Sequence, residues 1–130
     1  MKAIARAPYV PASPYRSELE RAYAHHLWAR QAAQEIRAYS YEAIAFRLAW
    51  GVVKRARVYT PDFLVINGAG EVELHETKGS RNARGQKAAL DRLDRAAAAY
   101  SFFRWLLVER GSRGEWQTTE IRRLEGAVVT

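Results

Sequence analysis

One stretch, RVYTPDFLVINGAGEVELHETKG at residues 57–79, constrains the fold more than any other part of this chain. Apolar, β-branched and aromatic residues recur with a period of two over 59–66 and 71–78, which is typical of β-strands. Residues 67–70 lie between these segments and contain the Asn-Gly pair that favours a tight turn. The stretch therefore predicts a β-hairpin.

The first predicted strand carries a carboxylate on an apolar face. Asp62 is in phase with Leu64 and Ile66, so its side chain points the way core residues point. Phe63 and Val65 occupy the other face and are apolar too. A strand that is apolar on both faces is expected inside a sheet rather than at its edge.

The second predicted strand repeats this arrangement. Glu76 and Lys78 continue the side that Leu74 begins, whereas His75 takes the opposite side. Pairing Leu64 with Leu74 then places Asp62 opposite Glu76, with Cβ atoms roughly 5 Å apart. Two facing carboxylates repel one another unless a positive charge lies between them, and a divalent cation with oxygen ligands meets that need. Lys78 supplies a further positive charge at the same end of the hairpin.

The motifs in this region resemble a known group of nucleases. Pro61-Asp62, followed by Glu76-Thr77-Lys78, is similar to the PD-(D/E)xK signature. The wider pattern consists of YTPDFL at 59–64, the Asn-Gly turn, ETKG at 76–79 and RSELE at 16–20. This pattern resembles the phage endonuclease I type of Holliday-junction resolvase, small uncharacterised phage and prophage nucleases, and the catalytic domain of transposon-end endonucleases. The likeness covers residues 15–79 well and the following helix and strand loosely.

The resemblance implies a fold, an activity and a set of site residues. The fold is a single α/β domain with a mixed β-sheet flanked by helices, and the activity is Mg²⁺-dependent hydrolysis of DNA phosphodiesters. Asp62, Glu76 and the main-chain carbonyl of Thr77 would hold one or two Mg²⁺ ions, for which Mn²⁺ substitutes. Glu20 would complete the shell, and Lys78 would position the attacking water. Branched or junction DNA is the implied substrate and a homodimer the implied assembly.

Other interpretations share the chemistry or the fold. A nicking, restriction-like or transposon-end endonuclease would cut a different DNA substrate with the same residues. A nucleic-acid-binding module could keep the fold without cleaving, although the loss of an acid or of the lysine expected for such a module is not seen. Glu20 is ambiguous in itself, because it is also the third helical residue of a capping box that begins at Ser17.

Composition narrows the class of partner. The chain has 130 residues and a formal net charge of +7, which favours a polyanionic partner, nucleic acid first. Membrane surfaces also attract basic proteins, and a net charge serves solubility as well. There is no cysteine, which excludes disulfides and thiol chemistry. No apolar run approaches the roughly 18 residues of a membrane span, and no signal-peptide pattern is present, so we expect a soluble cytoplasmic protein. The sequence contains no phosphate-binding glycine loop, so we expect no nucleotide cofactor.

Hydrophobic periodicity, helix caps and the positions of glycine and proline predict the elements in the rest of the chain. We expect an extended basic arm at 1–14, a nuclease domain at 15–125 and a tail at 126–130. Helices are predicted over 17–37 and 86–100, and further strands over 39–50, 102–109 and 116–121. Basic residues in the two connecting segments are candidates for phosphate contacts: Lys54, Arg55 and Arg57 before the hairpin, and Arg81, Arg84 and Lys87 after it.

Overall fold

The structure is a computed structural model that describes residues 13–48, 57–79 and 83–121, with 83–86 described by their backbone alone. Its elements in chain order are α1 (Glu18–Ala32), β1 (Ile36–Tyr41), β2 (Phe46–Leu48), β3 (Arg57–Tyr59), β4 (Phe63–Asn67), β5 (Val72–Lys78), α2 (Ala83–Ala99), β6 (Arg104–Arg110) and β7 (Trp116–Ile121). Five strands form one sheet in the order β1-β4-β5-β6-β7, and β2 pairs with β3 separately. The β5–β6 pair is parallel and the others are antiparallel, so the predicted mixed α/β sheet is confirmed.

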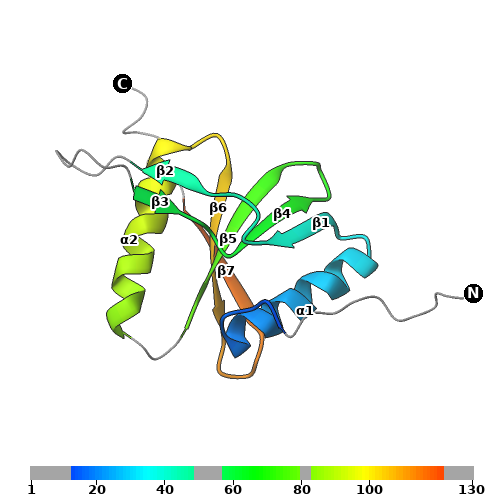
Figure 1. The fold of residues 1–130 in the computed structure, drawn as a ribbon. Helices are drawn as coiled ribbons and strands as arrows, with labels where there is room; N and C mark the ends of the chain where they lie inside the picture. The colour runs from blue at the N-terminus through cyan, green and yellow to red at the C-terminus, as the bar shows by residue number, and fades with distance from the viewer. Residues whose placement is uncertain (1–12, 49–56, 80–82, 122–130) are drawn as a thin grey trace, which may run out of the picture.

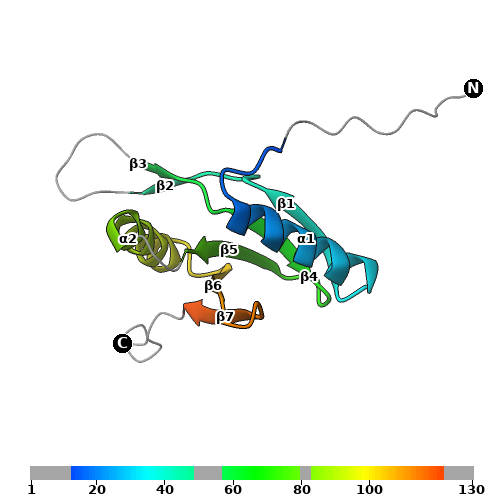
Figure 2. The same ribbon diagram turned by 90° about the horizontal axis from the view of Figure 1, so that it is seen from below.

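The sheet separates two apolar clusters. On one face, α1 packs through Tyr23 and Leu27 against Phe63 and Val65. On the other face, α2 and the β2–β3 ribbon pack against side chains that include Leu74 and Trp105. Figures 1 and 2 show this arrangement, with α1 and α2 on opposite sides of the sheet and the ribbon beside α2. Each strand of the central hairpin is thus covered on both faces, as its alternation predicts.

The central hairpin has the predicted turn and register. Ile66 pairs with Val72 and Leu64 with Leu74, and β4 lies between β1 and β5. The side chain of Asn67 stabilises the turn, because its Oδ1 accepts hydrogen bonds from the N–H groups of Ala69 and Glu71 at 2.9 Å each. Sequence alternation therefore predicted which hairpin residues share a face.

The single strand predicted over 59–66 is wrong in one respect. Tyr59 ends β3 in the small ribbon, and β4 begins only at Phe63. Pro61 lies in the break and has no N–H to donate to a ladder, which explains why neither strand continues through it. The backbone oxygen of Asp62 accepts instead from the N–H of Glu42 at 2.8 Å, beyond the end of β1. Asp62 therefore lies at the end of the sheet, immediately before β4.

The predicted strand over 39–50 is also two strands. Glu42 has a φ of +49°, in the left-handed region that extended strands do not use, and β1 ends at the preceding residue. β1 itself begins at Ile36, within the segment predicted as helix, because α1 ends at Ala32 and Gln34 has a φ of +64°. The predicted N-terminus of α1 is confirmed, since the Ser17 Oγ accepts from the N–H of Glu20 at 3.1 Å.

The remaining elements differ from expectation by a few residues. α2 begins at Ala83 rather than at 86, so the backbone of Arg84 is helical and not part of a polar loop. β6 and β7 follow close to the predicted positions. The arm as far as residue 12, Lys54, Arg55, Arg81 and the tail at 126–130 lie outside the described residues. Within the described part of the chain, no helix is long and apolar enough to cross a membrane.

Candidate active site

A cavity of about 330 Å³ opens where the ends of β1 and β3 meet the start of β4 and the second half of β5. Four carboxylates line it, and they come from α1, the residue after β1, the residue before β4, and β5: Glu20, Glu42, Asp62 and Glu76. The guanidinium-bearing residues Arg16 and Arg92 line it as well, together with Val58, Tyr59 and Thr60. The structure thus brings the three acids singled out in the sequence into one cavity and adds a fourth.

Asp62 is buried and held by one of its two oxygens. Only 8% of the residue is exposed. Oδ2 accepts hydrogen bonds from the N–H of Thr77 at 2.8 Å and from its hydroxyl at 2.7 Å. Oδ1 accepts none from the described residues and is not sealed from solvent. Burial raises the pKa of Asp62 from 3.8 to about 6, the two Thr77 bonds oppose that rise, and the charges of Glu20 and Glu42 add to it.

Glu76, on β5, lines the same cavity and is 9% exposed. Its Oε1 accepts a hydrogen bond from the hydroxyl of Tyr59 at 2.6 Å. Burial first, and the negative charge of Asp62 second, raise the pKa of Glu76 from 4.5 to about 8. The Tyr59 hydroxyl, the positive charge of Arg92 and the backbone of Asp62 act in the other direction. The two carboxylates therefore repel one another in the metal-free protein, as the register predicts.

Glu20 joins the cavity through the first turn of α1. Its Oε1 accepts from the N–H of Arg16 at 3.0 Å and from the hydroxyl of Tyr41 at 2.7 Å. The capping box is therefore shifted by one residue, because the acid bonds the N–H before Ser17 and not that of Ser17 itself. Glu20 thus bonds the backbone at the helix start and also lines the cavity with Asp62, a position compatible with both interpretations of this residue.

Glu42 and Arg16 form the rim of the cavity. Their side chains make an ion pair with Nε to Oε2 at 3.1 Å, and the Arg16 side chain is 75% exposed. The sequence did not predict that Glu42 lines the cavity. A continuous strand through this residue would hold its side chain on a face of the sheet, away from the cavity. The left-handed backbone at Glu42 is what turns it there.

Lys78 lies beside this cavity rather than in it. Its Nζ pairs with Oε2 of Glu109 at 3.1 Å, its neighbour across the parallel β5–β6 pair. It lines a smaller adjoining cavity of about 70 Å³, which also contacts Glu76 and Thr77. The predicted face of Lys78 is therefore observed, but the cations that line the acidic cavity are Arg16 and Arg92.

Two of the cavity carboxylates, Asp62 and Glu76, suit a hard divalent cation. No three carboxylate or histidine side chains among the described residues stand close enough together to hold a metal ion. Mg²⁺, however, commonly binds through one or two carboxylates and keeps several waters. Asp62 and Glu76 are a buried pair that repel each other, and Asp62 keeps an oxygen open to the cavity, so these two residues fit such an ion. The N–H of Thr77 points toward Asp62, and in an extended strand the carbonyl of the same residue points to the same side.

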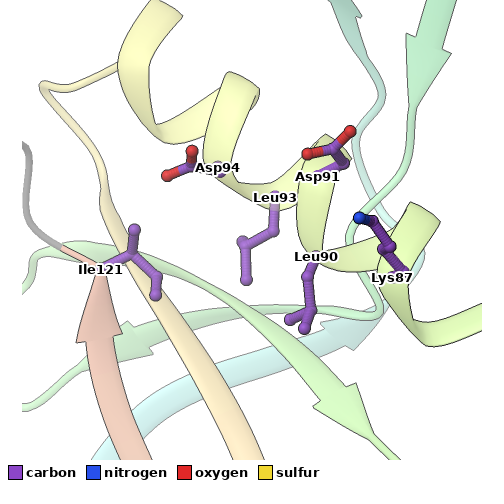
Figure 3. Close-up of a pocket in the computed structure, with 6 residues that line it drawn as sticks. All are labelled: Lys87, Leu90, Asp91, Leu93, Asp94 and Ile121. Carbon is purple, nitrogen blue, oxygen red and sulfur yellow. The ribbon is translucent and has the colours of Figure 1, made fainter. Parts of the chain in front are cut away.

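The basic residues predicted to contact phosphate are only partly described. Arg57 begins β3 and is exposed. Lys87 is exposed on α2 and lines a second groove of about 360 Å³ with Asp91, Asp94 and Ile121, shown in Figure 3. In Figure 3 the two aspartates and Lys87 rise from α2 around an apolar floor that includes Leu90 and Leu93. Lys87 therefore does not line the acidic cavity.

His75 lies on the other face of the sheet, as predicted. Its Nδ1 is 2.7 Å from the hydroxyl of Tyr23, and its Nε2 is 2.8 Å from Oε1 of Glu73. Burial would raise the pKa of Glu73, but hydrogen bonds from His75 and Asn67 outweigh it and lower that pKa. This buried chain ties α1 to β5 and serves the fold rather than the cavity.

Comparison with known proteins adds little to these observations. No protein-family profile and no curated protein matches the sequence. Among solved structures, the crystal structure of SSO0001 is similar over 82% of this chain, with 18% identity and a TM-score of 0.47. The match covers 53% of that protein, so this chain spans about half of its length. Function is therefore inferred from the cavity's own residues.

Proposed function

We propose that this protein is a Mg²⁺-dependent endodeoxyribonuclease with a PD-(D/E)xK core. The observation that carries the proposal is the buried pair of Asp62 and Glu76, which share one open cavity and both have raised pKa values. A fold without a ligand for this pair would gain stability by replacing either acid, because facing buried carboxylates are costly. Perturbed acids that converge in a cavity are a frequent mark of a catalytic site.

Each residue has a role in this mechanism. Asp62 and Glu76 would hold the cation, with the carbonyl of Thr77 as a third ligand and Glu20 behind them. The chemistry that Mg²⁺ or Mn²⁺ supplies in such a site is Lewis-acid activation of water and stabilisation of charge on the phosphate. The hydrogen bonds from Thr77 and Tyr59 fix one oxygen of each carboxylate and so orient the pair. Lys78, held by Glu109 beside Glu76, would orient the water for in-line attack on phosphorus.

The proposed substrate and assembly rest on the motif resemblance and on the net charge. The motif resemblance favours branched or junction DNA cut by a homodimer, and the net charge of +7 suits DNA of any shape. Nicking, restriction-like and transposon-end activities use the same chemistry. A second candidate is a module that binds DNA without cutting it. The engagement of Lys78 with Glu109, and the absence of a three-acid cluster among the described residues, favour that candidate.

Cleavage assays on linear, flap and four-way DNA test the proposal. The parent should cut at least one of these with Mg²⁺ or Mn²⁺ and none in EDTA. Asp62→Asn should give no detectable cleavage, yet its melting temperature in EDTA should equal or exceed that of the parent, because one buried charge is removed. Millimolar Mg²⁺ should raise the melting temperature of the parent and not that of the variant.

Two outcomes would count against this assignment. A parent that binds DNA but cuts none of the three substrates would leave the non-cleaving module. An Asp62→Asn variant that cuts like the parent would remove Asp62 from the chemistry, and one that melts well below the parent in EDTA would make it a structural acceptor for Thr77.

A further inference from the structure

Arg92 is the cation that α2 presents to the acidic cavity. It lies four residues before Ala96, which is fully buried, and next to the buried Leu93. Residues four apart lie on one side of a helix, so Arg92 is at the border of the stripe that packs on the sheet. From there it lines the cavity with Asp62 and Glu76. Its positive charge opposes the rise in the pKa of both Glu76 and Tyr59, so the guanidinium is close enough for its field to reach them.

Arg92 nevertheless makes no hydrogen bond and no ion pair with any described residue. The side chain is partly buried, unlike the exposed Arg16, which pairs with Glu42. Arg104 is comparably exposed and forms ion pairs with three glutamates. A guanidinium has five N–H donors, and leaving them without acceptors in a partly desolvated place is unfavourable.

Neutralising the acids does not account for this arrangement. If Arg92 served to balance Glu76, the two side chains would lie within ion-pair distance, and they do not. The groups that donate to the Glu76 carboxylate are uncharged: the hydroxyl of Tyr59 and the backbone of Asp62. The Arg92 donors thus stay open on a cavity whose other wall consists of carboxylates.

We propose that Arg92 binds the non-bridging oxygens of the DNA phosphate that enters this cavity. This inference rests on the proposed function and adds a substrate-binding residue to it. A planar guanidinium matches phosphate oxygens in two parallel hydrogen bonds, which a lysine cannot reproduce. If Asp62 and Glu76 held a cation, Arg92 would add a second positive charge beside the phosphate. Lys78 already pairs with Glu109. Among the described residues of α2, Arg92 is the cation that lines the cavity and that a phosphate can reach.

DNA affinity without cleavage tests the proposal. Fluorescence anisotropy with a labelled duplex and a labelled four-way junction is measured in Ca²⁺ in place of Mg²⁺, over a series of salt concentrations. Arg92→Gln should weaken binding by about tenfold to a hundredfold, as expected for charge-assisted hydrogen bonds. It should also reduce the slope of log affinity against log salt by about 0.9. Arg92→Lys should recover only part of the affinity.

The control is Arg95→Gln, which removes the same charge from the exposed surface of the same helix, outside the cavity. It should change the affinity by less than about twofold. Melting temperatures of all variants are compared in EDTA and in Ca²⁺. A merely charge-balancing Arg92 predicts full recovery with lysine and no loss of affinity once Ca²⁺ is saturating, and either result would overturn the proposal. Parental affinity in Arg92→Gln would overturn it as well.

Failure of the proposed function gives a different result. If the parent binds neither DNA, the DNA partner is wrong, and inorganic phosphate with Ca²⁺ becomes the probe in thermal melting. Stabilisation of the parent but not of Arg92→Gln would then keep Arg92 as an anion site for another phosphate compound. Equal responses of the two proteins to phosphate would remove the anion site as well.

Discussion

At the scale of single residues, the hydroxyl of Tyr59 and the carboxylate of Glu76 act as one unit. The 2.6 Å bond between them opposes the effect of burial on the pKa of Glu76. Cleavage that requires an ionised Glu76 should therefore depend on Tyr59 as well. Tyr59 is a positioning residue in this scheme.

Cleavage should appear as pH rises through the pKa of Glu76. Replacing Tyr59 with phenylalanine should raise that pKa and so move the appearance of cleavage to higher pH. A hydrogen bond to a charged group contributes about 1.5–3 kcal/mol, which corresponds to roughly one or two pH units. The measurement is the rate of cleavage against pH at fixed Mg²⁺. Tyr100→Phe is the matched control, because it loses a hydroxyl bond of 2.6 Å to the carbonyl of Arg47, outside the cavity. Equal displacement of both profiles would contradict the positioning role of Tyr59.

The raised pKa values of Asp62 and Glu76 also predict how stability depends on pH without metal. Their folded pKa values, about 6 and about 8, exceed the ordinary values of 3.8 and 4.5. Between those limits the folded protein binds more protons than the unfolded chain, so the free energy of unfolding falls as pH rises from about 4 to 8. The loss is on the order of a few kcal/mol.

Denaturant unfolding in EDTA at several pH values from 4 to 9 measures this decline. Asp62→Asn should flatten the lower part of the curve, and Mg²⁺ should raise stability most at high pH, because the ligands must lose their protons to bind. Stability that rises between pH 5 and pH 8 in EDTA would show that the two acids are not destabilised by burial.

At the scale of elements, α1 delivers Glu20 to the cavity through its own cap. Glu20→Gln keeps an oxygen that can accept from the N–H of Arg16 and from the Tyr41 hydroxyl, so the melting temperature should hold. The charge beside Asp62 is lost, and turnover at limiting Mg²⁺ should fall. Glu18→Gln is the control on the same turn, where the acid pairs only with Arg21 on the surface. Full turnover by Glu20→Gln would restrict Glu20 to capping.

Local alternation was enough to predict the hairpin and the facing acids. Side-chain direction in a strand depends on parity, which the sequence shows directly, and Leu64 with Leu74 fixed the register. The contribution of Tyr59 was missed because the chain breaks at Pro61 and parity does not carry across the break. Its signal was the proline itself.

Other features depend on contacts between distant elements and could not be predicted. The pairing of Lys78 with Glu109 requires β6 to lie parallel to β5 in one register. The presence of Arg92 in the cavity depends on how α2 is rotated against the sheet. Helical spacing shows which residues are buried but not which border residue meets the site.

At the scale of the whole molecule, the charge is divided between an acidic cavity and a basic remainder. The net charge of +7 includes four cavity carboxylates and only two cavity arginines, so the excess of positive charge lies elsewhere. Under the proposed function, such a distribution would attract DNA over a wide area and leave the acidic cavity for the cation.

The basic residues after the hairpin test this distribution. Replacing Arg81, Arg84 and Lys87 with glutamine should reduce the slope of log affinity against log salt by up to about 3, at roughly 0.9 per phosphate contact. Lys87 lies among Asp91 and Asp94 in the groove of Figure 3, so Lys87→Gln alone should contribute least. Discrimination between duplex and junction should change less than affinity. An unchanged slope would remove these residues from the DNA contact.

The turn of the central hairpin lies at the opposite end of β4 and β5 from the cavity, yet it decides which side chain faces Asp62. Asn67 pins that turn through two backbone N–H groups, and the register of both strands follows from it. Insertion of one residue there would rotate β5 by one position, sending Glu76 toward α1 and bringing a neighbour with different chemistry into the cavity. The length of the turn at residues 67–70 therefore decides which side chain joins Asp62 in the cavity, and under the proposed function a related chain with a longer or shorter turn should carry its second acid at a correspondingly shifted position.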